Sequence, residues 1–310
     1  MEEIFENILV PVDGSQQSKN AQDMAAFLAK LFNSKITLFH VISNELLLLS
    51  GQMYSPREDF VPVNPVTYQF PRTISFPKPR ENIFPIEVVR EMTEQYKAIG
   101  ESALADGVTR FAKAGLAVKE KVVEGNDVAE SIISEGKVGD YDLIILGNSG
   151  SESSELDLHL GSVAHKVTLR SKKPTLIVRK KREIKKLLVP IEGSAKEECA
   201  IQKAQAIADK SGSTAILLHV QEASISKMRP EIREIGLQVL DHASNMMLGT
   251  RLEKRLISGD PANTIIQIAE QENVDLIIMN KGGLGTLKRF FLGSVTDHVL
   301  HYGTVSVLLT

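Results

Sequence analysis

Hydrophobic and polar positions follow two distinct patterns along the chain. Short, continuous apolar runs indicate buried strands, and longer segments with apolar residues three or four positions apart indicate amphipathic helices. The runs predict five strands in each half of the chain: Ile8–Val12, Ile36–Val41, Ala117–Val123, Tyr141–Leu146, Thr175–Val178, Leu187–Ile191, Ala215–Val220, Arg251–Ile257, Val274–Met279 and Thr304–Leu309.

Helices are predicted between these strands. The first follows Asp13-Gly14-Ser15 and carries apolar residues at helical spacing from Ala21 to Leu31. The other helices are predicted over Glu91–Ala114, about 127–135, a segment ending at Asp209, Pro230–Leu248, and three segments that begin after Gly161, Asp260 and Gly293. Alternation of strand and helix predicts parallel strands joined by right-handed crossovers.

One sequence pattern occurs twice. Residues Lys185–Val220 repeat Glu6–Val41 without a gap, with Leu-Val-Pro, an acidic residue, Gly-Ser and a final Leu-x-His-Val in both. The period is that of a whole domain and not of a solenoid repeat. We therefore predict two tandem, doubly wound α/β domains over residues 1–180 and 184–310, each a five-stranded parallel sheet of order 3-2-1-4-5 with helices on both faces.

Two segments interrupt this pattern. Residues from 44 to about 90 form an insertion with seven of the twelve prolines, which lie between Pro56 and Pro85 and exclude regular helices and central strands there. We expect a surface cover that belongs to the first domain, with a flexible flap of no particular role as the alternative. The basic run 179–186 lacks interleaved aromatic residues and is expected to be a solvated linker between the domains.

Composition restricts the classes of function. A formal net charge of −3 argues against a general nucleic-acid-binding protein. The single cysteine, Cys199, excludes an internal disulfide and is expected to be a small buried side chain. No apolar run is long enough to span a bilayer, and the acidic start lacks the layout of a signal peptide. We expect a cytoplasmic protein with no membrane partner.

Candidate chemistry gathers where ligands bind in doubly wound sheets, beyond the carboxyl ends of strands one and four. Strand one ends at Asp13 or Glu192, and strand four is followed by glycine-containing loops. These loops read Gly147-x2-Gly150 before Gly161-Ser162, and Asn280-x2-Gly283 before Gly293-Ser294. Glycines admit a phosphate close to the backbone, and a Gly-Ser helix start offers free N–H groups to an anion. Plain turns, and carboxylates that only stabilise a helix start, are the alternatives.

Together these motifs resemble the universal stress protein family in its tandem two-domain form. The resemblance rests on Val-Pro-x-Asp-Gly-Ser after strand one and Gly-x2-Gly-x9-Gly-Ser after strand four, and it covers both halves outside the insertion. It implies a stress-response protein that binds an adenine nucleotide, ATP or AMP. If Mg²⁺ binds at all, we expect it to come with the phosphates. The aspartate would bind adenosine, Val41 would meet adenine through its backbone, and the loops would hold ribose and phosphates.

The resemblance implies specific binding residues in each half. They are Pro11, Val12, Asp13, Val41, Gly147, Asn148, Gly150, Gly161, Ser162 and Val163, and then Pro190, Ile191, Glu192, Val220, Asn280, Lys281, Gly283, Gly293, Ser294 and Val295. The chain departs from the family pattern at Glu192, which replaces aspartate, and at Asn280, which replaces glycine. The first-half loop is also one residue longer.

Catalysis is ranked below binding. His40 and His219 recur at equivalent strand ends, but the sequence places no catalytic partner beside them, so structural histidines are expected. His298 and His301 are expected on the surface of the last helix, and no His or Cys spacing predicts a metal site made of protein ligands alone. A slow ATP hydrolase, and an interaction protein that has lost its ligand, remain the alternatives.

Two expectations concern how the halves relate. The apolar fifth strands should pair edge to edge within one chain, since bare edges invite association. The resemblance suggests this pseudo-dimer and also allows a homodimer.

The two candidate nucleotide sites should be unequal. The first loop carries Glu152, Glu155 and Asp157, whereas Lys281, Lys288 and Arg289 accompany the second, so the second half should prefer ligands with more phosphates and the first should bind weakly or take AMP.

Overall fold

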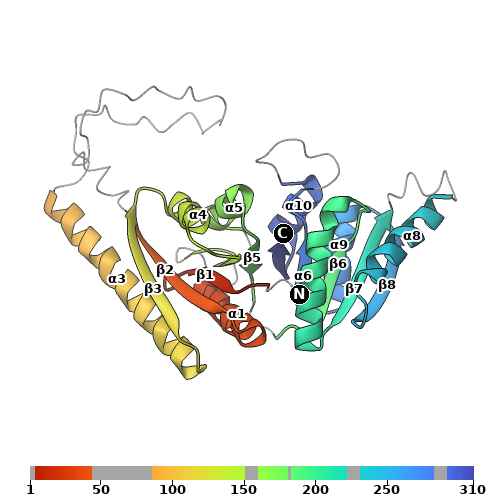
Figure 1. Ribbon diagram of the computed structural model, residues 1–310. Helices are drawn as coiled ribbons and strands as arrows, with labels where there is room; N and C mark the ends of the chain where they lie inside the picture. The colour runs from red at the N-terminus through yellow and green to blue at the C-terminus, as the bar shows by residue number, and fades with distance from the viewer. Residues whose placement is uncertain (1–3, 44–85, 151–159, 181–182, 222–230, 283–291) are drawn as a thin grey trace, which may run out of the picture.

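The computed structural model describes residues 4–43, 86–150, 160–180, 183–221, 231–282 and 292–310. Within them, one ten-stranded sheet runs through the molecule in the order β3-β2-β1-β4-β5-β10-β9-β6-β7-β8 (Figure 1). The strands are β1 (Asn7–Pro11), β2 (Lys35–Ser43), β3 (Val118–Gly125), β4 (Leu143–Gly147), β5 (Thr175–Val178), β6 (Lys186–Pro190), β7 (Thr214–Gln221), β8 (Arg251–Ser258), β9 (Leu276–Met279) and β10 (Ser306–Leu309).

Each half of the sheet has the predicted strand order. Read inward from β3 or from β8, the strands follow 3-2-1-4-5, and neighbouring strands within each half are parallel. The α/β fold class is therefore confirmed. Its central strands read as continuous apolar runs because helices cover both of their faces. Half of the residues in the outermost strands, β3 and β8, are charged and at least half are exposed, which discourages pairing with another chain.

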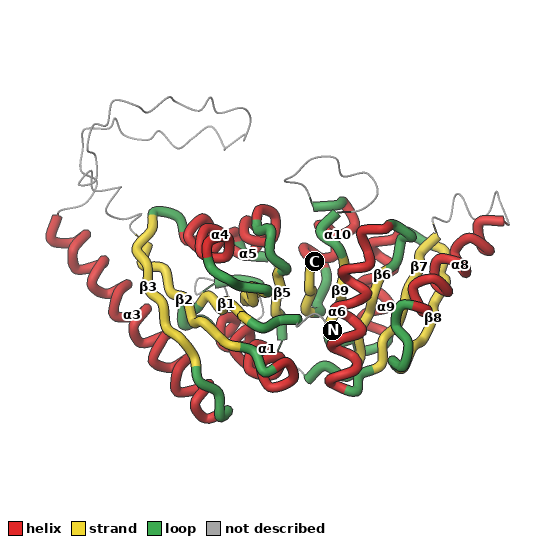
Figure 2. The backbone as a smooth tube through the Cα atoms, in the orientation of Figure 1, coloured by secondary structure: helices red, strands yellow, loops and turns green. Residues whose placement is uncertain are grey.

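Helices cover both faces of the sheet (Figure 2). One apolar core lies between the sheet and α1, α3, α6 and α8, and a second lies under α4, α5, α9 and α10. The helices are α1 (Gln16–Phe32), α3 (Ile86–Lys113), α4 (Val128–Val138), α5 (Ser162–Arg170), α6 (Glu198–Ser211), α8 (Glu231–Asn245), α9 (Pro261–Gln271) and α10 (Ser294–Tyr302), with a short 3-10 turn, η1 (Ala195–Glu197), before α6.

The insertion ends earlier than predicted. Helix α3 begins at Ile86, so the segment 86–90 is helical and does not belong to the insertion. No proline follows Pro85 in this region, and nothing in the sequence after it prevents helix formation. The rest of the predicted insertion, residues 44–85, lies outside the described residues.

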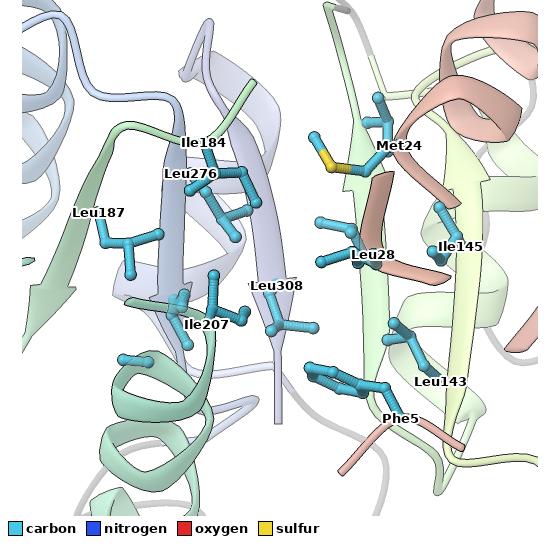
Figure 3. Close-up of a cluster of buried hydrophobic side chains, with 14 of the residues drawn as sticks. Phe5, Met24, Leu28, Leu143, Ile145, Ile184, Leu187, Ile207, Leu276 and Leu308 are labelled. Carbon is cyan, nitrogen blue, oxygen red and sulfur yellow. The ribbon is translucent and has the colours of Figure 1, made fainter. Parts of the chain in front are cut away.

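The two halves join at the fifth strands, as expected. β5 and β10 pair antiparallel, with Val307 opposite Ile177 and Leu308 opposite Leu176. One apolar cluster continues across this junction, so that side chains from α1 and β4 face side chains from α6, β9 and β10 (Figure 3). An antiparallel pair of equivalent strands gives the chain a pseudo-twofold axis, and burial of both edges removes them from solvent.

Two buried cations also cross the junction. The Arg179 guanidinium, just after β5, donates to the Leu300 carbonyl near the end of α10. The Lys281 ammonium, just after β9, donates to the Ser171 and Lys173 carbonyls beyond α5, at 2.8 and 2.9 Å. Burial lowers the pKa of Arg179 to about 10 and that of Lys281 to about 8. Each half thus places a cation where the helix dipole of the other half is negative.

Two expectations about single residues were wrong. Arg179 is not part of a solvated linker, because it is 5% exposed and its main chain also donates to Ser306. Cys199 is exposed, since it lies on the outer face of α6, where Lys203 contacts its sulfur at 3.1 Å. Helical periodicity alone left the orientation of α6 open at this position.

Candidate functional site

The turn after β1 positions the first candidate residue, Asp13. Its Oδ1 accepts hydrogen bonds from the Ser15 backbone N–H, at 3.0 Å, and from the Ser15 hydroxyl, at 2.6 Å. Gly14 makes this tight turn with φ of 82°, a value that favours glycine. The Ser15 hydroxyl in turn accepts from Ser18 N–H and caps α1. Both of these bonds to the carboxylate use Oδ1, which leaves Oδ2 facing the neighbouring loop.

That neighbouring loop follows β4. A Cβ atom built on Gly150 would lie 3.1 Å from Asp13 Oδ2, so the glycine loop and the carboxylate are adjacent. A Cβ atom on Gly147 would lie 2.7 Å from the Gln17 backbone, so only glycine allows α1 to approach β4 this closely. Asn148 is buried, and its carbonyl accepts from Gly161 N–H at 2.7 Å. The ends of β1 and β4 and the start of α5 therefore meet at one place.

This first crevice contains groups suited to an anion. Gly161 begins α5 without a side-chain cap, and Ser162 just after it is exposed. Ser149 Oγ is buried and has no hydrogen-bond partner within the described part of the chain. Uncapped helix N–H groups and the positive end of the helix dipole attract negative charge. Val163 is half-buried on the same helix, beside the apolar core.

The histidines at the ends of β2 and β7 have structural roles. His40 Nδ1 contacts the Val12 carbonyl at 2.7 Å, and His219 Nδ1 contacts the Ile191 carbonyl at the same distance. Since a carbonyl can only accept, each ring donates from Nδ1 and fixes the strand-one turn. The expectation of satisfied structural histidines is confirmed. Val41, the next residue, is buried, and Val220 is half-buried.

The equivalent turn in the second half is occupied by a different carboxylate. Glu197, at the end of η1, accepts from the backbone N–H groups of Glu192 and Gly193, the latter at 3.1 Å. Glu197 is buried, and this burial raises the pKa of its carboxyl to about 7. Glu192 itself is exposed and accepts from the Ser194 hydroxyl at 3.1 Å. The turn after β6 is thus closed by the chain's own carboxylate, beside half-buried Pro190 and buried Ile191.

The second-half loop also differs. Asn280 stands where the first half has Gly147, and its Oδ1 accepts from the Thr310 hydroxyl at 2.7 Å. The Lys281 carbonyl accepts from Gly293 N–H at 2.9 Å, so the loop still meets the start of α10. The Lys281 ammonium, however, lies across the junction on carbonyls of the first half and not toward a ligand. The phosphate-attracting role expected for this ammonium therefore stays a prediction, and these contacts do not support it.

The remaining second-half candidates are only partly described. Gly293 begins α10 without a side-chain cap, Ser294 is exposed and Val295 is half-buried. Gly283, Lys288 and Arg289 lie outside the described residues, as do Glu152, Glu155 and Asp157 of the first half. The charge comparison between the two loops therefore stays a prediction for these residues.

Comparison with known families decides which family this geometry belongs to. The model of the universal stress protein family matches residues 5–61, 77–179 and 183–310. The chain belongs to the universal stress protein family.

Named members of this family resemble parts of the chain. Universal stress protein Slr1230 from Synechocystis is 29% identical over 174 residues, which cover 55% of this chain and 58% of that protein. Universal stress protein YxiE from Bacillus subtilis is 29% identical over 143 residues, which cover 40% of this chain and 97% of YxiE. Nearly the whole of YxiE thus matches less than half of the tandem chain.

A solved structure shows the same fold over the whole length. The universal stress protein from Archaeoglobus fulgidus aligns with a TM-score of 0.65 and 19% identity, covering 100% of this chain and 98% of that one. None of the described helices combines the length and apolar character that a membrane span requires.

Sequence reasoning missed Glu197 in this universal stress protein. A signal was present, because Ser194-x-x-Glu197 has the spacing of a capping box, in which the glutamate reaches back to backbone N–H groups at the helix start.

A separate hollow of about 280 Å³ lies between the amino ends of β9 and β10, lined by Glu270, Asp275 and Ser306 among others. It does not touch any candidate nucleotide-binding residue.

Proposed function

We propose that this universal stress protein binds an adenine nucleotide, ATP or AMP, in the crevice of its first half. The observation that carries the proposal is the approach of Gly150 to Asp13, whose Oδ2 would lie 3.1 Å from a Cβ placed on that glycine. It brings a fixed carboxylate acceptor next to a glycine loop and an uncapped helix start. A sugar or base donor fits the carboxylate, and phosphate fits the helix N-terminus.

The residues at this crevice fit such a ligand in several independent ways. Asp13 is held in place through Oδ1, so its second oxygen is pre-oriented for a donor. The start of α5, just after Gly161, has no side-chain cap and leaves its first N–H groups free, and the buried Ser149 hydroxyl lies in the preceding loop. A bound triphosphate would bring Mg²⁺ as its counter-ion, since Mg²⁺ commonly binds proteins through substrate phosphates.

The second half is proposed to bind nucleotide weakly or not at all. Glu197 already occupies the backbone N–H groups of Glu192 and Gly193 in the turn after β6. The expectation that this half prefers ATP relied partly on the Lys281 ammonium, which is bonded elsewhere. Gly282 stands at the position of Ser149, so the equivalent hydroxyl is missing as well.

Binding without efficient turnover is part of the proposal. Within the described residues, His40 and His219 each use Nδ1 to hold a backbone carbonyl of the turn after strand one, a structural role. A phosphate-release assay on the purified chain with ATP and Mg²⁺ tests this. We expect far less than about one turnover per second, the lower end of ordinary enzymes; faster release would identify a hydrolase.

The binding proposal is tested with the intact chain and a matched pair of loop variants. Mass spectrometry of the denatured, purified protein should release ATP or AMP, and calorimetry should show binding of one or both to the emptied protein. A Cβ at Gly161 would lie 3.0 Å from Ser149 Cα, so Gly161→Val should displace the loop and abolish binding. Gly293→Val, at the equivalent position, should leave it intact. No nucleotide recovered and none bound at about millimolar ATP, a concentration at which even weak sites fill, would refute the proposal.

A further inference from the structure

Three side chains of metal-binding type meet where the two halves join. His165 lies on α5, while Asp297 and His301 lie on α10, and one ligand atom from each is within 4.8 Å of the other two. His165 Nε2 is 3.6 Å from Asp297 Oδ1, and His301 Nδ1 is 3.4 Å from the same oxygen. The two imidazole rings have centroids 5.1 Å apart. Figure 1 shows α5 and α10 beside the central strands β5 and β10.

The internal repeat explains why these residues meet. His165 and Asp297 occupy equivalent positions, each in the first turns of the helix that begins after Gly161 or Gly293. Since β5 and β10 pair antiparallel about a pseudo-twofold axis, equivalent helix positions approach one another near that axis. One half supplies an imidazole and the other a carboxylate. His301 follows Asp297 by one turn of α10 and completes the group.

The tautomer of His301 is set by a backbone contact. Its Nδ1 lies 2.9 Å from the Asp297 carbonyl oxygen, which can only accept a hydrogen bond. The neutral ring therefore carries its proton on Nδ1 and its lone pair on Nε2. Metal-ligating histidines are usually held in this way, with the second ring nitrogen bonded to a carbonyl or carboxylate.

The charge and exposure of the group suit a cation from solution. The side chains of His165 and Asp297 are 39% and 47% exposed, so an ion can enter without unfolding. The neighbouring cations on α5, Lys166 and Arg170, pair with Asp127 and Glu130. Within the described residues, the ion pairs of Asp297 are those with the two histidines.

We propose that His165, Asp297 and His301 bind a Zn²⁺ ion, or a similar divalent transition metal ion, that joins the two halves of the chain. Two nitrogens and one carboxylate oxygen form a common ligand set for such ions, with water in the fourth position. Ligand atoms about 2 Å from the metal lie roughly 3.3 Å apart, whereas the three ligand atoms here lie within 4.8 Å of one another, so the side chains would rotate inward, with His301 presenting Nε2. The proposal does not depend on nucleotide binding.

The test uses the full chain, stripped of metal by a chelator and free of nucleotide, titrated with Zn²⁺ in a calorimeter. We expect one Zn²⁺ per chain, and a melting temperature that rises with Zn²⁺ because the ion binds the folded state. His165→Gln, Asp297→Asn and His301→Gln should each weaken binding more than about tenfold. The control is His298→Gln. The ring of His298 lies one turn before His301 and packs on Tyr302, so it is not one of the proposed ligands. This variant should bind Zn²⁺ as the parent chain does.

Melting in chelator separates loss of a ligand from loss of the fold. The three ligand variants should melt within a few degrees of the parent without metal, since their side chains are partly exposed, and should lose the Zn²⁺-dependent rise. Absence of Zn²⁺ binding by the parent chain would overturn the proposal. Binding that survives all three substitutions would also overturn it.

Discussion

The turns after β1 and β6 have the same backbone path but are completed by different carboxylates. In the first half, Asp13 lies in the turn and Ser18 occupies the position of Glu197. In the second half, Glu197 bonds the turn's own N–H groups, and exposed Glu192 is left at the rim. A duplicated fold can thus keep its topology while one of its two crevices is closed by an internal side chain.

The loops after β4 and β9 differ in a related way. Gly147 lets the start of α1 rest directly on the end of β4. In the second half, a 3-10 turn precedes α6, which begins at Glu198, and the equivalent residue is Asn280 with its side chain bonded to Thr310. The helix start and the loop residue have changed together.

Exchange of the two loop residues, Gly147 and Asn280, should have the largest effect on the free energy of unfolding. Gly147→Asn would force a Cβ to within 2.7 Å of the Gln17 backbone, and we expect a loss of about 3 kcal/mol in the free energy of unfolding. Urea denaturation of parent and variant measures it. The reverse exchange, Asn280→Gly, removes one hydrogen bond and should cost only about 1 kcal/mol. Equal effects of the two exchanges would mean that the two loops are packed alike.

The regular elements could be predicted from the sequence because their signals are local or repeated. The strand order was expected from the doubly wound fold class and the family resemblance, and the β5–β10 pairing was expected from that resemblance together with two apolar edges. Long-range contacts of single side chains carry no such signal. Nothing local indicates that Lys281 would reach Ser171, or that Arg179 would be buried against α10.

The metal-type cluster was also beyond sequence reasoning. His165 and Asp297 lie in different halves, so no spacing rule joins them, and His301 was expected only as a surface group. The Glu197 contact, by contrast, was encoded in a capping-box spacing that could have been recognised.

The Glu197 carboxyl should make the stability of the second half depend on pH. Its folded pKa of about 7 lies above the ordinary value of 4.5, so the folded state holds a proton that the unfolded state releases. That contribution is fully present below about pH 4.5 and is lost as the pH rises to about 7. Relative to the parent, Glu197→Gln should gain on the order of 2 kcal/mol of stability across this range.

Thermal unfolding of parent and Glu197→Gln at pH 5 and pH 7.5 measures this gain. The matched control is Ser18→Ala, at the equivalent first-half position, for which the difference from the parent should not change with pH. A constant difference between parent and Glu197→Gln would show that Glu197 is not protonated in the fold.

Removal of the Lys281 ammonium should have the smallest effect on stability, and it tests whether this residue has a role in binding phosphate. Lys281→Met leaves the Ser171 and Lys173 carbonyls without their donor but also removes a buried charge, so a net loss of about 1 kcal/mol is expected. Urea denaturation measures the stability, and calorimetry with ATP should give an unchanged affinity. A clear loss of ATP binding would restore a phosphate-binding role for this residue.

The number of nucleotides bound per chain, measured by calorimetry on a matched pair of carboxylate variants, tests the central claim most directly. We predict one strong site in the parent chain, weakened more than about tenfold by Asp13→Asn through loss of a charged acceptor, and unaffected by Glu192→Gln. Strong binding that survives Asp13→Asn and is lost in Glu192→Gln would contradict this claim, because the second half would then hold the working crevice.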